Sequence, residues 1–100
     1  MTIHKTQQDG SLTLALEGRL DTTTAPRLQE ALLPAFNEAS EITLDFANLI
    51  YLSSAGLRVL LLGEKQAKAS GKIMALTNVT SDVMEVFDMT GFSNILTFIG

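Results

Sequence analysis

Apolar residues in this chain recur at two different spacings, and stretches with the two spacings alternate along the sequence. Ser11–Glu17 carries leucine at every second position, which is typical of a half-buried β-strand. The stretch after Pro26 repeats its apolar residues every third or fourth position as far as Ala39, which is typical of an amphipathic helix. Such alternation in a chain of 100 residues predicts an α/β fold, with helices packed on a mixed β-sheet.

The same patterns predict elements in the order ββαβαβαβ, within one domain that spans residues 1–100. The expected strands are Ile3–Gln8, Ser11–Glu17 (ended by Gly18), Glu41–Phe46, Lys72–Leu76 and Ile95–Ile99. The expected helices are one that opens at Asp21–Thr24, a second over Leu57–Ala69, and a third capped by Ser81 and ended by Gly91. Pro34 cannot donate a hydrogen bond to the carbonyl of Glu30, so the first helix should kink or break there.

Charge and composition argue against several classes of function. The net charge is −4 and the seven Lys and Arg residues are scattered, so we expect neither nucleic-acid binding nor contact with anionic membranes. The chain has no cysteine, and Met1–Gly10 lacks the apolar region of a signal peptide. The longest wholly apolar run, Val59–Leu62, is too short to span a bilayer. By elimination, we expect a cytoplasmic protein.

Residues able to support catalysis are sparse. His4 is the only histidine, and no cluster of His, Asp and Glu has metal-ligand spacing. Ser54 and Gly56 match half of the G-x-S-x-G nucleophile elbow, but Leu52 occupies the place of its first glycine. Without a well-placed histidine the serine has no evident base. We therefore expect no enzymatic activity, no metal and no cofactor.

The serine pair Ser53–Ser54 opens the second predicted helix and has two interpretations. The simpler is that one of the two hydroxyls caps the helix. The other starts from the free N–H groups and positive dipole end at a helix N-terminus, which tolerate a phosphate with a gain of about 0.3–2 kcal/mol. Phosphorylation there would act on a protein that docks over this end of the helix.

Three segments together resemble the STAS domain family, which includes the bacterial anti-sigma factor antagonists. The run from Leu49 to Leu60 is similar to the family's signature, Gly18–Ala25 to its strand-to-helix turn, and Phe87–Phe92 to a motif that ends a late helix. The spacing of the three segments also matches. Since the resemblance covers nearly the whole chain, it implies a STAS-type fold.

The resemblance also implies a switch. STAS antagonists bind an anti-sigma factor that is a serine kinase and thereby free the sigma factor; the kinase then phosphorylates a serine at the N-terminus of the second helix, and the partners separate. A phosphatase restores the antagonist. The resemblance implies Ser54 as the acceptor, with Ser53 as the alternative. In the family pattern D-S-[ST]-G, Ser53 stands at the aspartate and Ala55 at the Ser or Thr.

We expect the partner to cover both strand-to-helix turns and the exposed side of the helix Leu57–Ala69, because this fold places the preceding strands side by side. The expected contact residues are Asp21, Thr22, Thr23, Thr24, Ser53, Ser54, Gly56 and Arg58. Asp21 either supports this site or only caps its helix, and Arg58 either contacts the partner or only solvates the helix. An alternative function has the same fold: a non-phosphorylated docking subunit of a transport or larger signalling complex, in which Ser54 is only a cap.

Overall fold

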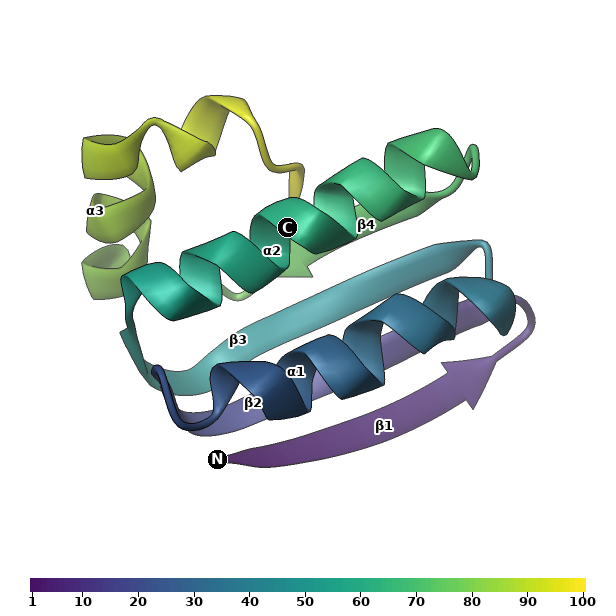
Figure 1. Cartoon of the computed structure of the whole chain (residues 1–100), viewed down its shortest axis with the longest axis horizontal. Coiled ribbons are helices and arrows are strands. Elements are labelled where there is room, and N and C mark those ends of the chain that lie inside the picture. Colours follow the sequence, from purple (N-terminus) through teal and green to yellow (C-terminus); the bar gives the residue numbers. More distant parts are fainter.

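One five-stranded sheet forms the centre of the computed structural model, which describes residues 1–100 (Figure 1). The strands lie in the spatial order β1-β2-β3-β4-β5; β1 pairs antiparallel with β2, and the other pairs are parallel. Their bounds are β1 (Thr2–Gln8), β2 (Ser11–Leu20), β3 (Glu41–Leu52), β4 (Ile73–Thr77) and β5 (Phe98–Ile99). The predicted mixed sheet is thus confirmed.

Three α-helices connect the parallel strands, in the predicted order. They are α1 (Ala25–Leu32), α2 (Ser54–Ala69) and α3 (Ser81–Thr90), with short 3₁₀ turns η1 (Leu33–Asn37) and η2 (Phe92–Asn94). The predicted break at Pro34 is confirmed, because α1 ends two residues earlier and η1 continues the chain. Gly91 ends α3 at φ 82°, a left-handed conformation that suits glycine.

The helices cover one face of the sheet, where the core lies. Leu14 of β2 and Leu44 of β3 are in register and fully buried. Helices α1 and α2 lie on the same side of the sheet (Figure 1). Helix α3 joins the same core through Phe87, whose ring lies 6.2 Å from that of Phe46. The opposite face carries residues such as Thr13, which are only partly buried.

Two predicted strand ends are wrong in the same direction. Gly18 does not end β2: it adopts φ 102° beside an irregularity in the β2–β3 pairing, and the strand continues to Leu20. The next strand, β3, runs on to Leu52 instead of ending at Phe46. The strand ends were predicted from strict alternation of apolar residues. The irregular pairing beside Gly18 interrupts that alternation, and both strands continue beyond it.

Three further boundaries differ from the prediction. Helix α2 begins at Ser54 rather than at Leu57. Thr80, not Ser81, caps α3, because its side chain accepts a hydrogen bond from the Val83 N–H. The last strand is only Phe98–Ile99, since the residues before it are used by η2 and by the turn that follows it.

The extra length of β2 and β3 positions the two strand-to-helix turns. Pairing between β2 and β3 continues to Leu20 and Leu52, whereas β4 pairs with β3 no farther than Asp45. The carboxyl ends of β2 and β3 therefore extend beyond the rest of the sheet together. The Ser53 N–H then donates to the carbonyl of Leu20 at 2.9 Å, which joins one turn to the other.

Candidate functional site

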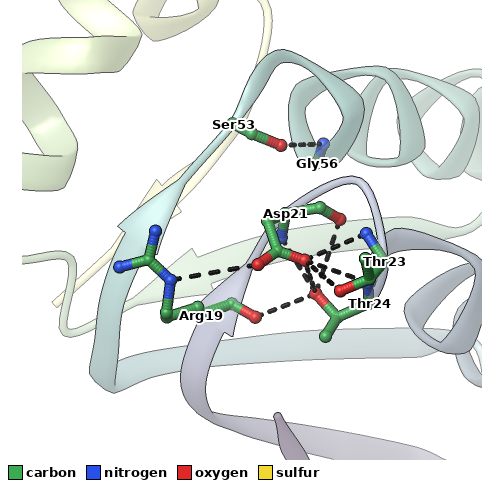
Figure 2. A network of polar contacts seen from close by, with 6 residues as sticks. All are labelled: Arg19, Asp21, Thr23, Thr24, Ser53 and Gly56. Atoms are coloured by element: carbon green, nitrogen blue, oxygen red, sulfur yellow. Dashed lines mark hydrogen bonds and ion pairs between the residues drawn. The ribbon is translucent and has the colours of Figure 1, made fainter.

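The turn between β2 and α1 is closed by the carboxylate of Asp21. Its Oδ1 accepts hydrogen bonds from the N–H groups of Thr23 and Thr24, at 3.0 and 3.1 Å, and from the Thr23 hydroxyl at 2.7 Å (Figure 2). The Thr24 hydroxyl donates to the carbonyl of Arg19 at 2.8 Å and accepts from the Asp21 N–H at 2.9 Å. Asp21 thus supplies the acceptors at the start of α1, where the N-cap residue Thr24 makes no side-chain cap.

These contacts keep Asp21 charged. The hydrogen bond from the Thr23 hydroxyl lowers the pKa of the Asp21 carboxyl below its ordinary value of 3.8; desolvation opposes this shift, and the Thr24 and Thr23 N–H groups add to it. Arg19 Nε also lies 3.9 Å from Asp21 Oδ2. The first turn therefore presents a fixed negative charge.

The turn between β3 and α2 contains the two serines. Ser53 is the N-cap residue, and its hydroxyl accepts from the Gly56 N–H at 3.4 Å, which is long for such a bond (Figure 2). Ser54 is the first residue of α2; its side chain is exposed, and its hydroxyl makes no hydrogen bond with the rest of the chain. The two serines thus have different roles, since the cap is Ser53 and the free hydroxyl belongs to Ser54.

Gly56, which was predicted as a contact residue, does not lie on the surface. It is buried, and a Cβ added to it would lie 2.7 Å from Leu20 Cγ and 2.8 Å from Leu52 Cδ1. A side chain there would force Leu20 or Leu52 to shift. Its place in the motif is therefore explained by the close approach of α2 to the ends of β2 and β3.

A groove of about 280 Å³ separates the first turns of α1 and α2. It is lined by Thr22, Ala25, Pro26, Gln29, Ala55, Arg58 and Val59. Arg58 is exposed and forms no ion pair or hydrogen bond with another residue of the chain. The groove thus connects Thr22 of the first turn with the helix that begins at Ser54.

Three exposed residues near these turns were missed from the sequence. Ile50 and Tyr51 are 73% and 41% exposed, and the Arg19 guanidinium lies 4.1 Å from the centre of the Tyr51 ring. The sequence pattern does not find them: Leu49–Leu52 is a run of four apolar residues, and strict alternation would place Tyr51 on the buried face with Leu49. Leu49 and Leu52 are buried, and the two between them are not.

No group of three or more His, Asp or Glu side chains is placed to hold a metal ion. None of the helices is long and apolar enough to cross a membrane.

Comparison with known proteins decides the family. The family model described as "Mlab, STAS domain" matches residues 3–97. The chain belongs to the STAS domain family. The anti-sigma-B factor antagonist of Bacillus subtilis (strain 168) is 27% identical to this STAS domain over 90 residues, which are 90% of this chain and 83% of the relative. BtrV of Bordetella bronchiseptica, provisionally named an anti-sigma factor antagonist, is 35% identical over 88 residues, or 87% of this chain and 76% of BtrV.

Solved structures show the same fold at lower identity. Unphosphorylated SpoIIAA, an anti-sigma factor antagonist, aligns with a TM-score of 0.78 at 16% identity, covering 99% of this STAS domain and 88% of that chain. The NMR structure of TM1081 aligns with a TM-score of 0.86 at 19% identity, covering 99% of this chain and 81% of the other. At these identities the likeness establishes the architecture.

Proposed function

We propose that this STAS domain is an anti-sigma factor antagonist whose binding is switched off by phosphorylation of Ser54. In its unmodified form it binds an anti-sigma factor that has serine kinase activity, in the cytoplasm, and so releases the sigma factor. The observation that carries the proposal is the exposed Ser54 hydroxyl, free of hydrogen bonds, at the first position of α2. The names of the relatives from Bacillus subtilis and Bordetella bronchiseptica support the class of partner.

The phosphorylation step needs little from the domain itself. The Ser54 oxygen attacks the γ-phosphorus of ATP held by the kinase; the new O–P bond forms as the bond to ADP breaks, and the hydroxyl proton is released. Because Ser54 Oγ makes no hydrogen bond within the chain, it can enter a kinase site without unfolding α2. A phosphatase that hydrolyses the ester resets the protein.

The added charge explains how the switch would work. A phosphoserine carries about −1.5 to −2 charges at neutral pH. Placed unpaired in a protein interface, such a charge costs several kcal/mol, and each 1.4 kcal/mol lowers the affinity about tenfold. The proposed interface contains Asp21 to Thr24, Ser53, Ser54 and Arg58, with Ile50 and Tyr51 at its border. Phosphorylation would therefore release the partner with little change in the fold.

A second candidate function is a permanent docking subunit of a transport or larger signalling complex. Two residues favour it. Ser53 already caps α2 and stands where the family pattern has an aspartate before the acceptor, and Ala55 stands where the pattern has Ser or Thr. In that case Ser54 is only the first residue of the helix. The two functions differ in whether Ser54 is ever modified.

Labelling in vitro separates the two candidates. The purified protein is incubated with ATP and, one at a time, with each anti-sigma factor kinase of its own organism, and phosphate is located by mass spectrometry. We expect one kinase to label the wild type and Ser53→Ala but not Ser54→Ala. Labelling of Ser54→Ala at the wild-type level would show that the acceptor is wrong, and labelling by no kinase would favour the docking subunit.

A further inference from the structure

Arg58 is a charged side chain without a partner inside the molecule. No ion pair or hydrogen bond joins its guanidinium to another residue, whereas Arg19 stacks over Tyr51 and Lys68 pairs with Glu64 at 3.8 Å. It is also the only charged residue among the seven that line the groove between α1 and α2. The lining of the groove therefore carries one free cation and no anion, in a chain whose net charge is −4.

Arg58 also lies within reach of Ser54. Both residues belong to α2 and are four positions apart, so they share one face of the helix, with about 5–6 Å between their Cβ atoms. Both side chains are exposed. A guanidinium can bind a phosphate through two parallel hydrogen bonds, a geometry that suits it better than an ammonium group.

We infer that Arg58 binds the phosphate of phosphorylated Ser54, and that in the unmodified protein the same guanidinium receives an acidic side chain of the partner in the α1–α2 groove. This inference rests on the proposed function and deepens it. The phosphate and the partner's carboxylate compete for one cation, so phosphorylation removes an attractive contact as well as adding a repulsive charge. The acidic chemistry of the partner group follows from the single positive charge in the groove.

The phosphate contact can be tested without any partner. Phosphoserine is installed at position 54 by genetic code expansion, and the phosphate is titrated by ³¹P NMR, its second pKa being about 6 without a nearby charge. We expect this pKa to be about 0.5 lower in the otherwise wild-type protein than in Arg58→Ala, because a nearby cation favours the dianion. Arg27→Ala is the control: Arg27 is exposed on α1 and does not line the groove, so its removal should leave the pKa unchanged. An equal pKa with and without Arg58 would overturn the contact.

The competition is tested with the kinase that labels Ser54 in the experiment above, by calorimetry of unphosphorylated variants. We expect Arg58→Ala to weaken binding about tenfold, Arg58→Lys to weaken it less, and Arg27→Ala to leave it unchanged. Ser54→Asp should weaken binding at least about tenfold in the wild-type background and by a smaller factor in Arg58→Ala, where no attractive contact is left to lose and only the repulsive charge remains. Equal weakening by Ser54→Asp in both backgrounds would overturn the competition.

Failure of the proposed function can be distinguished from failure of the Arg58 inference. If no kinase labels or binds the protein, the switch itself is wrong, whereas the ³¹P titration still decides whether Arg58 binds the phosphate. Thermal unfolding followed by circular dichroism checks that Arg58→Ala and Arg27→Ala are both folded, as expected for two exposed arginines.

Discussion

The two strand-to-helix turns lie side by side but are held by different forces. The β2–α1 turn is fixed by hydrogen bonds, since Asp21 Oδ1 alone accepts from two backbone N–H groups and the Thr23 hydroxyl. The β3–α2 turn has only one side-chain cap bond, a long one from Gly56 N–H to Ser53, and is held by the backbone bond from Ser53 N–H to Leu20 and by the packing of Gly56 against Leu20. Such a turn leaves the Ser54 hydroxyl available, which suits a site of modification.

The largest expected effect comes from filling the space at Gly56. Gly56→Val places a branched side chain against Leu20 and Leu52, and we expect it to lower the free energy of unfolding by about 2–3 kcal/mol. Ala55→Val is the matched control, because Ala55 is only partly buried in the same helical turn. Urea denaturation measures both. Equal losses for the two variants would show that packing does not fix this turn.

The second-largest loss of stability is expected from removing the hydrogen-bond acceptors of Asp21. Asp21→Ala leaves the N–H groups of Thr23 and Thr24 without their partner, and we expect it to cost about twice as much stability as Ser53→Ala. Asp21→Asn keeps an acceptor oxygen and should lie between wild type and Asp21→Ala. The comparison of the two turns would fail if Asp21→Ala cost no more than Ser53→Ala.

Ser53→Ala is expected to have a small effect. It removes one cap bond of 3.4 Å, so the expected loss is about 0.5 kcal/mol, at the low end for a cap residue. Helix α2 keeps its packing against the core. A loss above about 1.5 kcal/mol by urea denaturation would indicate that the cap, and not the packing, holds this turn.

The smallest effect is in the pH dependence of stability. Because the pKa of Asp21 is lowered in the folded state, its contribution is complete above the ordinary value of 3.8 and is lost as the pH falls below that value, through the folded pKa. The stability difference between wild type and Asp21→Asn should therefore be constant near neutral pH and shrink below pH 3.8. A difference that grows on acidification would contradict the sign of this shift.

Much of the fold could be predicted from the sequence, because its local signals agree with the tertiary structure. Alternating leucines, Pro34 and Gly91 each act through the backbone of their own segment. The strand ends could not be predicted, because a bulge beside Gly18 carries β2 on to Leu20, and only pairing between strands shows this. Likewise, the sequence alone did not show which of Ser53 and Ser54 caps the helix. Only the position of the Gly56 N–H identifies Ser53 as the cap.

Only part of the candidate site could be predicted from the sequence, because the rest depends on tertiary packing. The order of strands brings Asp21 and Ser54 to one end of the sheet, as expected from the fold that the family resemblance implied. Exposure is a property of the packed structure, so the burial of Gly56 was not predicted and Ile50 and Tyr51 were not included. The freedom of Arg58 in the groove is likewise visible only once α1 and α2 are in place.

The most direct test is mass spectrometry of the protein isolated from its own cells under several growth conditions. The account predicts phosphate on Ser54, in a fraction that changes with condition, and none on Ser53, whose oxygen caps α2. Unmodified Ser54 in every condition, or phosphate on Ser53 alone, would contradict it.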